Sequence, residues 1–213
     1  MPEIQNIKEL KRELEKQMVI IGITGTIGAG KGTLVEYLVR EKNFVHYSVR
    51  GFLIEELEKR KLAINRDTMV LLANELRQKN SPSYIIDCLF EQAQNRGENA
   101  VIESIRTAGE AESLRNKGSF CLLAVDADPK IRYERIRKRN SETDHVSYEE
   151  FTANEQREMN TSDPNKQNLS KCIAMADYTL CNDGTIEELY KQLEEIMNEE
   201  EANEKKNDKI RKD

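Results

Sequence analysis

The chain has 213 residues, of which 38% are hydrophobic and 34% charged, and its formal net charge is −6. This length allows one sizeable domain with a small insertion and excludes two full domains with long tails. The acidic balance argues against a protein that coats nucleic acid, since such binding depends on neutralising many phosphates. No apolar run approaches the length of a membrane span and no signal-peptide pattern opens the chain, so we expect a cytoplasmic protein that binds neither membranes nor nucleic acid.

A glycine-rich loop near the start of the chain dominates the sequence. Residues 1–17 are polar with apolar positions at helical spacing and predict an appended helical arm, and the apolar run 18–23 predicts a buried strand. The loop follows this strand and precedes a helical pattern, which is the context of a phosphate-binding loop. Its glycines let backbone N–H groups surround a polyphosphate, and the lysine supplies a mobile charge. The predicted nucleotide contacts are Gly25, Thr26, Gly28, Ala29, Gly30, Lys31, Gly32 and Thr33.

The middle of the chain alternates predicted strands and helices. A second strand ends near Ser48, a helix follows from residue 52, and two further helices span 67–80, with Asp67 as N-cap, and 82–94. This two-helix excursion offers room for an acceptor site. The strand 99–102 then delivers Glu103 at its carboxyl end, where ligands gather in open parallel sheets. The simpler interpretation is that Glu103 caps the next helix and that Arg106 is a surface charge.

The second half of the chain carries a cation-rich helix and a polar segment. A strand over 119–125 leads into a helix over 130–139, where Arg135 and Arg139 are four residues apart and share a face, either a solvated one or one that meets an anion. Residues 140–165 predict a short lid with a helix over 146–159. Arg157 is its candidate for a charge that closes onto phosphate, unless it pairs with Glu155 and Glu158.

The C-terminal part completes a doubly wound α/β fold with a five-stranded parallel sheet and helices on both faces. A short helical run ends at 176, a last strand covers 177–182, and a helix begins near 185. Beyond residue 198 the composition is rich in Glu, Lys and Asn, which predicts a disordered tail over 198–213. The predicted domain therefore spans 18–197, with its lid at 140–165.

The loop pattern G-x-x-G-x-G-K-G-T resembles adenylate kinase and its nucleoside monophosphate kinase relatives. Most phosphate loops place Ser or Thr directly after the lysine, whereas this chain has Gly32 there and defers the hydroxyl to Thr33. The resemblance implies ATP as donor and Mg²⁺ held largely through water, with Thr33 and Glu103 as its partners. It also implies that Arg106, three residues after the acidic group, grips an acceptor phosphate, and that Arg135 and Arg139 contact the donor phosphates.

These features predict ATP-dependent phosphoryl transfer to a small phosphorylated acceptor, a nucleoside or deoxynucleoside monophosphate, bound by Ser48, Arg50 and Arg106. Dephospho-CoA kinases, which the segment A-D-Y-x-L-x-N-D-G-T-x-E-E-L also resembles, carry an aspartate near the position of Arg50, and adenylate kinases carry an arginine where this chain has Ile54. A dephospho-CoA kinase-like activity therefore stays an alternative. Residues 104–112 also look like the phosphate-loop portion of two-part deoxycytidylate deaminases, so a non-catalytic nucleotide sensor or a slow ATPase stays open as well.

Overall fold

The computed structural model describes residues 18–139 and 146–210, with only the backbone for 201–210. The predicted arm over 1–17 and the predicted loop over 140–144 lie outside this part of the chain. The described residues form one five-stranded parallel sheet in the order β2-β3-β1-β4-β5. The strands are β1 (Ile20–Gly25), β2 (Val45–Ser48), β3 (Ala100–Glu103), β4 (Phe120–Asp126) and β5 (Tyr178–Cys181).

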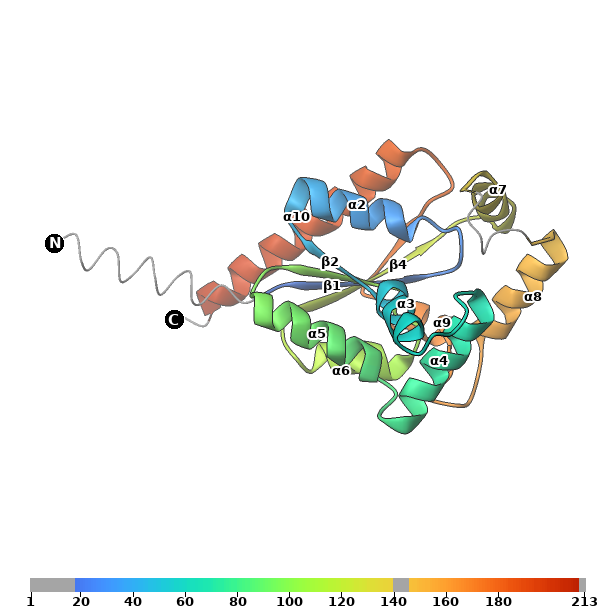
Figure 1. The fold of residues 1–213 in the computed structure, drawn as a ribbon. Coiled ribbons are helices and arrows are strands. Elements are labelled where there is room, and N and C mark those ends of the chain that lie inside the picture. Colours follow the sequence, from blue (N-terminus) through green and yellow to red (C-terminus); the bar gives the residue numbers. More distant parts are fainter. Residues whose placement is uncertain (1–17, 140–145, 211–213) are drawn as a thin grey trace.

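Helices cover both faces of this sheet, as Figure 1 shows, which confirms the predicted doubly wound fold. Helices α2 (Lys31–Lys42) and α10 (Ile186–Ile210) pack on one face. The other face carries α3 (Val49–Lys59), α4 (Arg66–Lys79), α5 (Tyr84–Arg96), α6 (Ala108–Arg115) and α9 (Leu169–Ala174). Strand β1 is central and buried at every position, which explains its unbroken apolar run.

The two remaining helices, α7 (Pro129–Arg139) and α8 (Tyr148–Met159), lie beyond the end of the sheet where β1 runs into the glycine-rich loop (Figure 1). Helix α7 begins at Pro129, one residue before its predicted start, and Asp128 Oδ1 accepts the N–H of Lys130 at 2.8 Å. Both helices therefore stand beside the carboxyl ends of the strands, where open parallel sheets bind their ligands.

Two predicted boundaries need correction. Helix α4 begins one residue earlier, at Arg66, and Asn65 caps it in a capping box with Thr68, so Asp67 is not the N-cap. Helix α10 continues to Ile210, so the segment 198–210, predicted to be disordered, is helical. The Glu and Lys residues that lower the hydropathy of this segment are good helix formers. The first half of α10 is anchored in the core by Leu189 and Leu193.

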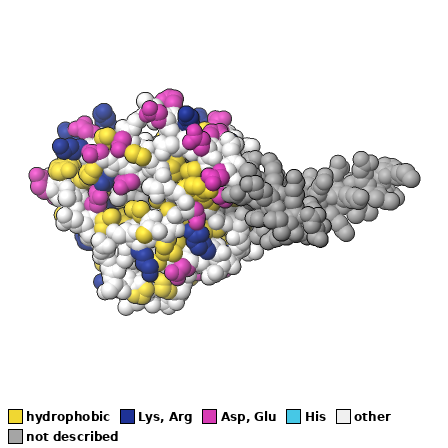
Figure 2. Space-filling view, turned by 180° about the vertical axis from the view of Figure 1, so that it is seen from behind, with side chains coloured by type: hydrophobic (Ala, Val, Ile, Leu, Met, Phe, Trp, Pro, Cys, Tyr) yellow, Lys and Arg dark blue, Asp and Glu magenta, His cyan; other side chains and the backbone are white. Residues whose placement is uncertain are grey.

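The surface carries mixed charges. On the face in Figure 2, Lys and Arg side chains are interspersed with Asp and Glu, so this face offers no continuous basic surface of the kind that binds nucleic acid. Within the described residues, no helix combines the length and the apolar character needed to cross a membrane.

Candidate active site

The glycine-rich loop has a backbone that other residues would not adopt. Gly25, Gly28 and Gly30 have φ angles of 136°, 78° and 106°. A Cβ atom on Gly30 would lie 2.2 Å from Nδ2 of Asn182, and one on Gly25 would lie 2.1 Å from the carbonyl oxygen of Val125. By contrast, a Cβ atom on Gly32 would meet no atom within 4 Å. The loop conformation therefore requires the first three glycines, and the space around Gly32 would admit a side chain.

This difference predicts opposite outcomes for two alanine substitutions two residues apart. Gly30→Ala places a Cβ against Asn182 on a strained backbone and should weaken ATP binding by at least about tenfold, because the loop must shift. Gly32→Ala should keep ATP affinity within about threefold, since it lies early in α2 with open space around it. Calorimetric titration of both variants with Mg-ATP measures the difference; equal losses would contradict this account of the loop.

Lys31 bends back onto its own loop. Its Nζ donates hydrogen bonds to the carbonyl oxygens of Gly25 and Thr26, both at 2.8 Å. Burial, and after it the positive charge of Arg106, lowers the pKa of Lys31 to about 7. Since a bound polyphosphate would favour the charged form, the protonation of Lys31 should depend on the ligand.

Nucleotide binding should therefore take up a proton. Above pH 7 the free protein holds Lys31 partly deprotonated, whereas a neighbouring polyphosphate restores a pKa nearer the usual value of about 10.4. Affinity for ATP should accordingly fall as the pH rises above about 7, with most of a proton taken up per ATP at about pH 8. Titrations in two buffers of different ionisation enthalpy measure this uptake, and Lys31→Arg, which stays charged, should abolish it; equal uptake in both proteins would assign the proton elsewhere.

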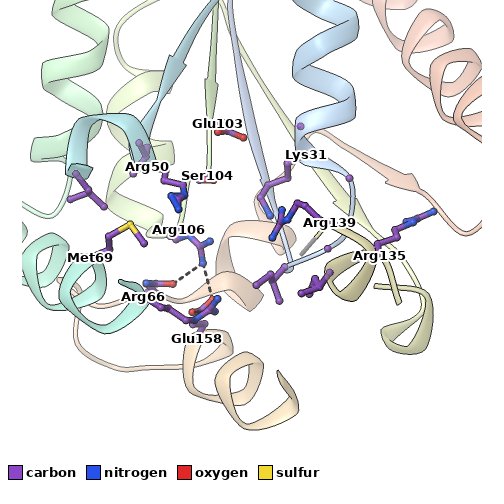
Figure 3. A pocket seen from close by; sticks show the side chains of 18 of the residues that line it. Lys31, Arg50, Arg66, Met69, Glu103, Ser104, Arg106, Arg135, Arg139 and Glu158 are labelled. Carbon is purple, nitrogen blue, oxygen red and sulfur yellow. Dashed lines mark hydrogen bonds and ion pairs between the residues drawn. The ribbon is translucent and has the colours of Figure 1, made fainter. Parts of the chain in front are cut away.

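A cavity of about 860 Å³ opens in front of the loop. One wall is the loop with the start of α2, from Ile27 to Thr33, and the residues Arg135, Arg139, Asn182 and Ile186. The opposite wall comes from α3, α4, the end of β3 and α8, and it contains Arg50, Arg66, Arg106, Glu158 and Gln167. Figure 3 shows Lys31 on one side of this space and Arg50, Arg66 and Arg106 on the other. The cavity thus joins the loop to an opposing group of arginines.

Glu158 bridges two of these arginines. Its Oε2 accepts from Nη1 of Arg106 at 2.8 Å, and its Oε1 accepts from Nη2 of Arg66. Burial of Glu158, which is 5% exposed, acts to raise its pKa, but Arg106 and Arg66 outweigh this effect and hold the pKa below its usual value. Nη1 of Arg106 also donates to Oε1 of Gln167 at 2.8 Å. The two guanidinium groups are thereby held side by side around one anion.

Arg50 differs from its neighbours on this wall. It is exposed, lines the cavity and has no ion pair or side-chain hydrogen bond within the described residues. It stands in the first turn of α3, two residues after the N-cap Ser48, whose hydroxyl accepts the N–H of Gly51. Arg50 is therefore available for an anionic ligand.

Glu103 provides the acidic group beside the loop. Its Oε1 lies 3.3 Å from Oγ of Ser48 and 3.5 Å from Nε2 of His46. Burial acts to raise the pKa of Glu103, but His46, Lys31 and Ser48 together hold it below the usual value, so the carboxylate is ionised at neutral pH. Glu103 and Thr33 both line the cavity and supply one carboxylate and one hydroxyl, which fit an octahedral Mg²⁺ completed by phosphate oxygens and water. No cluster of three His, Cys, Asp or Glu side chains suited to a metal occurs among the described residues.

The two arginines that the resemblance places at the phosphates of the phosphoryl donor reach the cavity. Arg135 and Arg139 both line it from α7, as their shared helix face predicted. Nη2 of Arg135 lies 3.4 Å from Oδ1 of Asn182, whose Nδ2 donates to the carbonyl oxygen of Ala29 at 2.8 Å. Nη1 of Arg135 is buried without a hydrogen-bond partner among the described residues, so the cavity contains a donor that lacks an acceptor.

Two predicted site residues do not face the cavity. Arg157 is 55% exposed and pairs with Asn154 and Asp67, because the buried face of α8 is the one that carries Phe151 and Glu158. Arg157 therefore pairs with other residues than Glu155 and Glu158, and its closure over a phosphate stays a prediction. The hydroxyl of Ser48 serves the cap of α3 and Glu103 instead of lining the cavity.

Within the loop itself, the roles also differ. Gly28, Gly30, Lys31, Gly32 and Thr33 line the cavity. Thr26 instead turns its hydroxyl to Oδ1 of Asp126 at 2.6 Å. Gly25, Thr26 and Ala29 thus contribute backbone that shapes the loop, through the contacts of their carbonyl oxygens with Lys31 and Asn182.

Sequence reasoning missed a buried arginine that joins the loop to α8. Arg132 is 2% exposed, and its Nη1 and Nη2 each donate to Glu155 at 2.8 Å. Nη1 also lies 3.3 Å from the carbonyl oxygen of Ile27 in the loop. The signal was present in the spacing, since Arg132, Arg135 and Arg139 follow one another at three and four residues and so share a face of α7.

Comparison with known proteins agrees with this geometry. A family profile described as an AAA domain matches residues 21–161, which include the glycine-rich loop and every residue named above on the opposite wall of the cavity except Gln167. A UPF0200 protein of Methanothermobacter thermautotrophicus is 31% identical over 182 residues, covering 84% of this chain and 90% of that protein. A UPF0200 protein of Sulfurisphaera tokodaii is 30% identical, covering 84% of this chain and 95% of that protein. This chain is a UPF0200 protein with an AAA domain.

Solved structures identify the fold of this UPF0200 protein as that of P-loop kinases. TT1252 from Thermus thermophilus has a TM-score of 0.54 at 21% identity, covering 86% of this chain and 98% of its own. Shikimate kinase from Bacteroides thetaiotaomicron has a TM-score of 0.53 at 16% identity, covering 85% and 99%. At these identities the likeness concerns the fold alone. The predicted P-loop kinase fold is confirmed.

Proposed function

We propose that this protein transfers a phosphoryl group from ATP to a nucleoside or deoxynucleoside monophosphate. The observation that carries the proposal is the shared cavity, with a phosphate loop on one wall and Arg50, Arg66 and Arg106 on the opposite wall. Lys31 and Arg106 are close enough for the charge of Arg106 to lower the pKa of Lys31. Two anionic groups bound at these walls would therefore meet between them.

In the proposed reaction the protein positions two phosphates and stabilises the charge between them. The loop amides and Lys31 hold the β- and γ-phosphates of ATP, and Arg135 and Arg139 contact them from α7. Arg50 and Arg106 hold the phosphate of the acceptor. Mg²⁺, held through Thr33 and Glu103 with water, would neutralise the donor phosphates. An acceptor phosphate oxygen is already ionised, so its attack requires no general base.

A hydroxyl acceptor, as in a dephospho-CoA kinase-like reaction, fits less well because it needs a carboxylate to take its proton. Glu158 is committed to Arg66 and Arg106, and Glu103 has a lowered pKa, which makes it a weak base. Arg50 stands after β2, where such a base would be expected, and it favours an anionic acceptor instead.

The test is incubation with Mg-ATP and a panel of nucleoside monophosphates, deoxynucleoside monophosphates and dephospho-CoA, with products separated by chromatography. Turnover should require a monophosphate acceptor. Arg106→Ala should raise the KM for that acceptor by roughly 10- to 100-fold while ATP affinity changes little, since a charge-assisted hydrogen bond contributes about 1.5–3 kcal/mol. Arg96→Ala, an exposed arginine on α5 outside the cavity, is the matched control.

Tight ATP binding without phosphorylation of any compound in the panel would overturn the kinase and favour a nucleotide sensor. ATP hydrolysis that no acceptor accelerates would favour a slow ATPase. Phosphorylation of dephospho-CoA alone would move the proposal to a hydroxyl acceptor.

A further inference from the structure

One face of α4 lines the acceptor half of the cavity with side chains whose charge and polarity change along the helix. They are Arg66, Met69, Val70, Ala73 and Arg77, which follow one another at three, one, three and four residues and so lie along one side of the helix. Both ends of this stripe are cationic and its middle is apolar. Arg66 and Arg77 stand 11 residues apart in sequence, which corresponds to about 16 Å along the helix axis. The α4 stripe can therefore accompany a ligand with an anionic end and an apolar body.

Helix α3 supplies the facing side of this part of the cavity. Val49 and Leu53 line it, and both are buried in the same core cluster as Ala73. Figure 3 shows Met69 on the same side of the cavity as Arg50, Arg66 and Arg106. Apolar side chains from two helices thus enclose a slot whose charged end is formed by Arg66 and Arg106. Such a slot suits a flat ring system carried by a phosphate-bearing molecule.

Arg77 at the far end of the α4 stripe has an unused donor. The side chain is 1% exposed and lines the cavity. Its Nε and Nη2 donate to Oε1 of Glu110 at 2.9 and 2.7 Å, whereas Nη1 has no hydrogen-bond partner among the described residues. A buried guanidinium nitrogen without an acceptor is costly, and its presence beside a cavity indicates an acceptor supplied by a ligand.

Glu110, in the first turn of α6, fixes the orientation of this guanidinium group. Its second oxygen, Oε2, accepts the backbone N–H groups of Arg106 at 2.8 Å and of Thr107 at 3.1 Å. Since Glu110 is fully buried and both of its oxygens are occupied, Arg77 cannot turn away without leaving that carboxylate unpaired. The free Nη1 is therefore a preorganised donor.

We propose that Arg77 reads the base of the acceptor nucleotide by donating from Nη1 to a ring carbonyl oxygen. The inference rests on the proposed function and names the substrate class of the same site: nucleotides of cytosine, uracil, thymine or guanine. The phosphate lies at Arg106 and Arg66, and the base lies between α3 and the apolar middle of the α4 stripe.

Adenine is the base that this arrangement disfavours. A guanidinium group only donates hydrogen bonds and cannot accept one from an amino group. Adenine carries no carbonyl oxygen, and N1 and N7 on its outer edge both flank the amino group, whose N–H bonds would face the guanidinium. An adenine in the slot would offer Nη1 only a ring nitrogen beside the competing amino group instead of a carbonyl oxygen, and we expect this to weaken binding by about tenfold or more.

The test compares CMP, dCMP, UMP and GMP with AMP, first by calorimetric binding to the full chain without ATP and then by kcat/KM with Mg-ATP. At least one carbonyl-bearing nucleotide should bind at least about tenfold more tightly than AMP. Arg77→Lys keeps a cation for Glu110 but removes Nη1, so it should reduce that preference to within about threefold while thermal unfolding shows a folded protein. Arg96→Lys, exposed and outside the cavity, is the matched control and should keep the preference.

The outcomes separate the two proposals. Preferential binding of a carbonyl-bearing base without phosphoryl transfer supports the role of Arg77 and overturns the kinase. Phosphorylation with AMP preferred, or with a base preference unchanged in Arg77→Lys, overturns the role of Arg77 and leaves the kinase standing. Binding of none of these nucleotides overturns the inference about Arg77, whatever the ATP-dependent activity.

Discussion

Replacing Lys31 by methionine is expected to lower acceptor-dependent turnover by about 10²–10³-fold, the loss typical when one donor to developing transition-state charge is removed. Lys31 is the cation that reaches from the start of α2 onto the loop, where its Nζ contacts the carbonyl oxygens of Gly25 and Thr26. ATP would replace these carbonyl groups as its partner. Steady-state kinetics with saturating acceptor measure the loss, which should appear in kcat as well as in KM.

Lys59→Met provides a matched control, since Lys59 is an exposed residue of α3 that pairs with Glu56 outside the cavity. The control should keep full turnover. Equal activity of the Lys31 and Lys59 variants would show that the loop does not carry the reaction, whatever it binds.

Replacing Glu110 by alanine is expected to lower the free energy of unfolding by about 3–5 kcal/mol, because it leaves the buried charge of Arg77 without its partner. The same substitution removes the capping box at the start of α6. Since a domain of this kind is stable by only about 5–15 kcal/mol, urea unfolding monitored by circular dichroism should show the midpoint fall sharply.

Glu112→Ala is the matched control on the same helix, where the side chain is exposed, and it should change stability by less than about 0.5 kcal/mol. Adding Arg77→Leu to Glu110→Ala should recover part of the loss, because the unpaired charge is then gone. A Glu110 variant as stable as the Glu112 variant would mean that the buried pair contributes nothing to the fold.

The parts of the site that could be predicted depend on local patterns. The glycine-rich loop lies between an apolar strand and a helix, and its φ angles are those that its glycines permit. Arg135 and Arg139 reach the cavity because a spacing of four residues places both on one face of α7. Glu103 and Arg106 follow the end of a parallel strand, and the common direction of such strands brings their ends to one edge. Each of these inferences required only one element and its neighbours.

The parts that could not be predicted depend on how helices pack against one another. Arg66 meets Glu158 across 92 residues of sequence, and Arg77 meets Glu110 across 33. For α8 the prediction chose the cation, Arg157, whereas burial of Phe151 turns Glu155 and Glu158 inward and Arg157 outward. The apolar position was the better guide, since residues four and seven places after Phe151 lie on its side of the helix.

The pairing of Glu158 with Arg66 and Arg106 has a consequence for which anions can bind at this wall of the cavity. The carboxylate serves as an internal counter-ion, so a free inorganic phosphate gains little by entering: it must first break two ion pairs that already satisfy these guanidinium groups. The nucleotide acceptor proposed above would bring further contacts along α3 and α4, and these would offset this cost. Arg66 and Arg106 are thereby less available to small anions than Arg50 is, and a ligand long enough to engage the rest of the cavity would compete better for them.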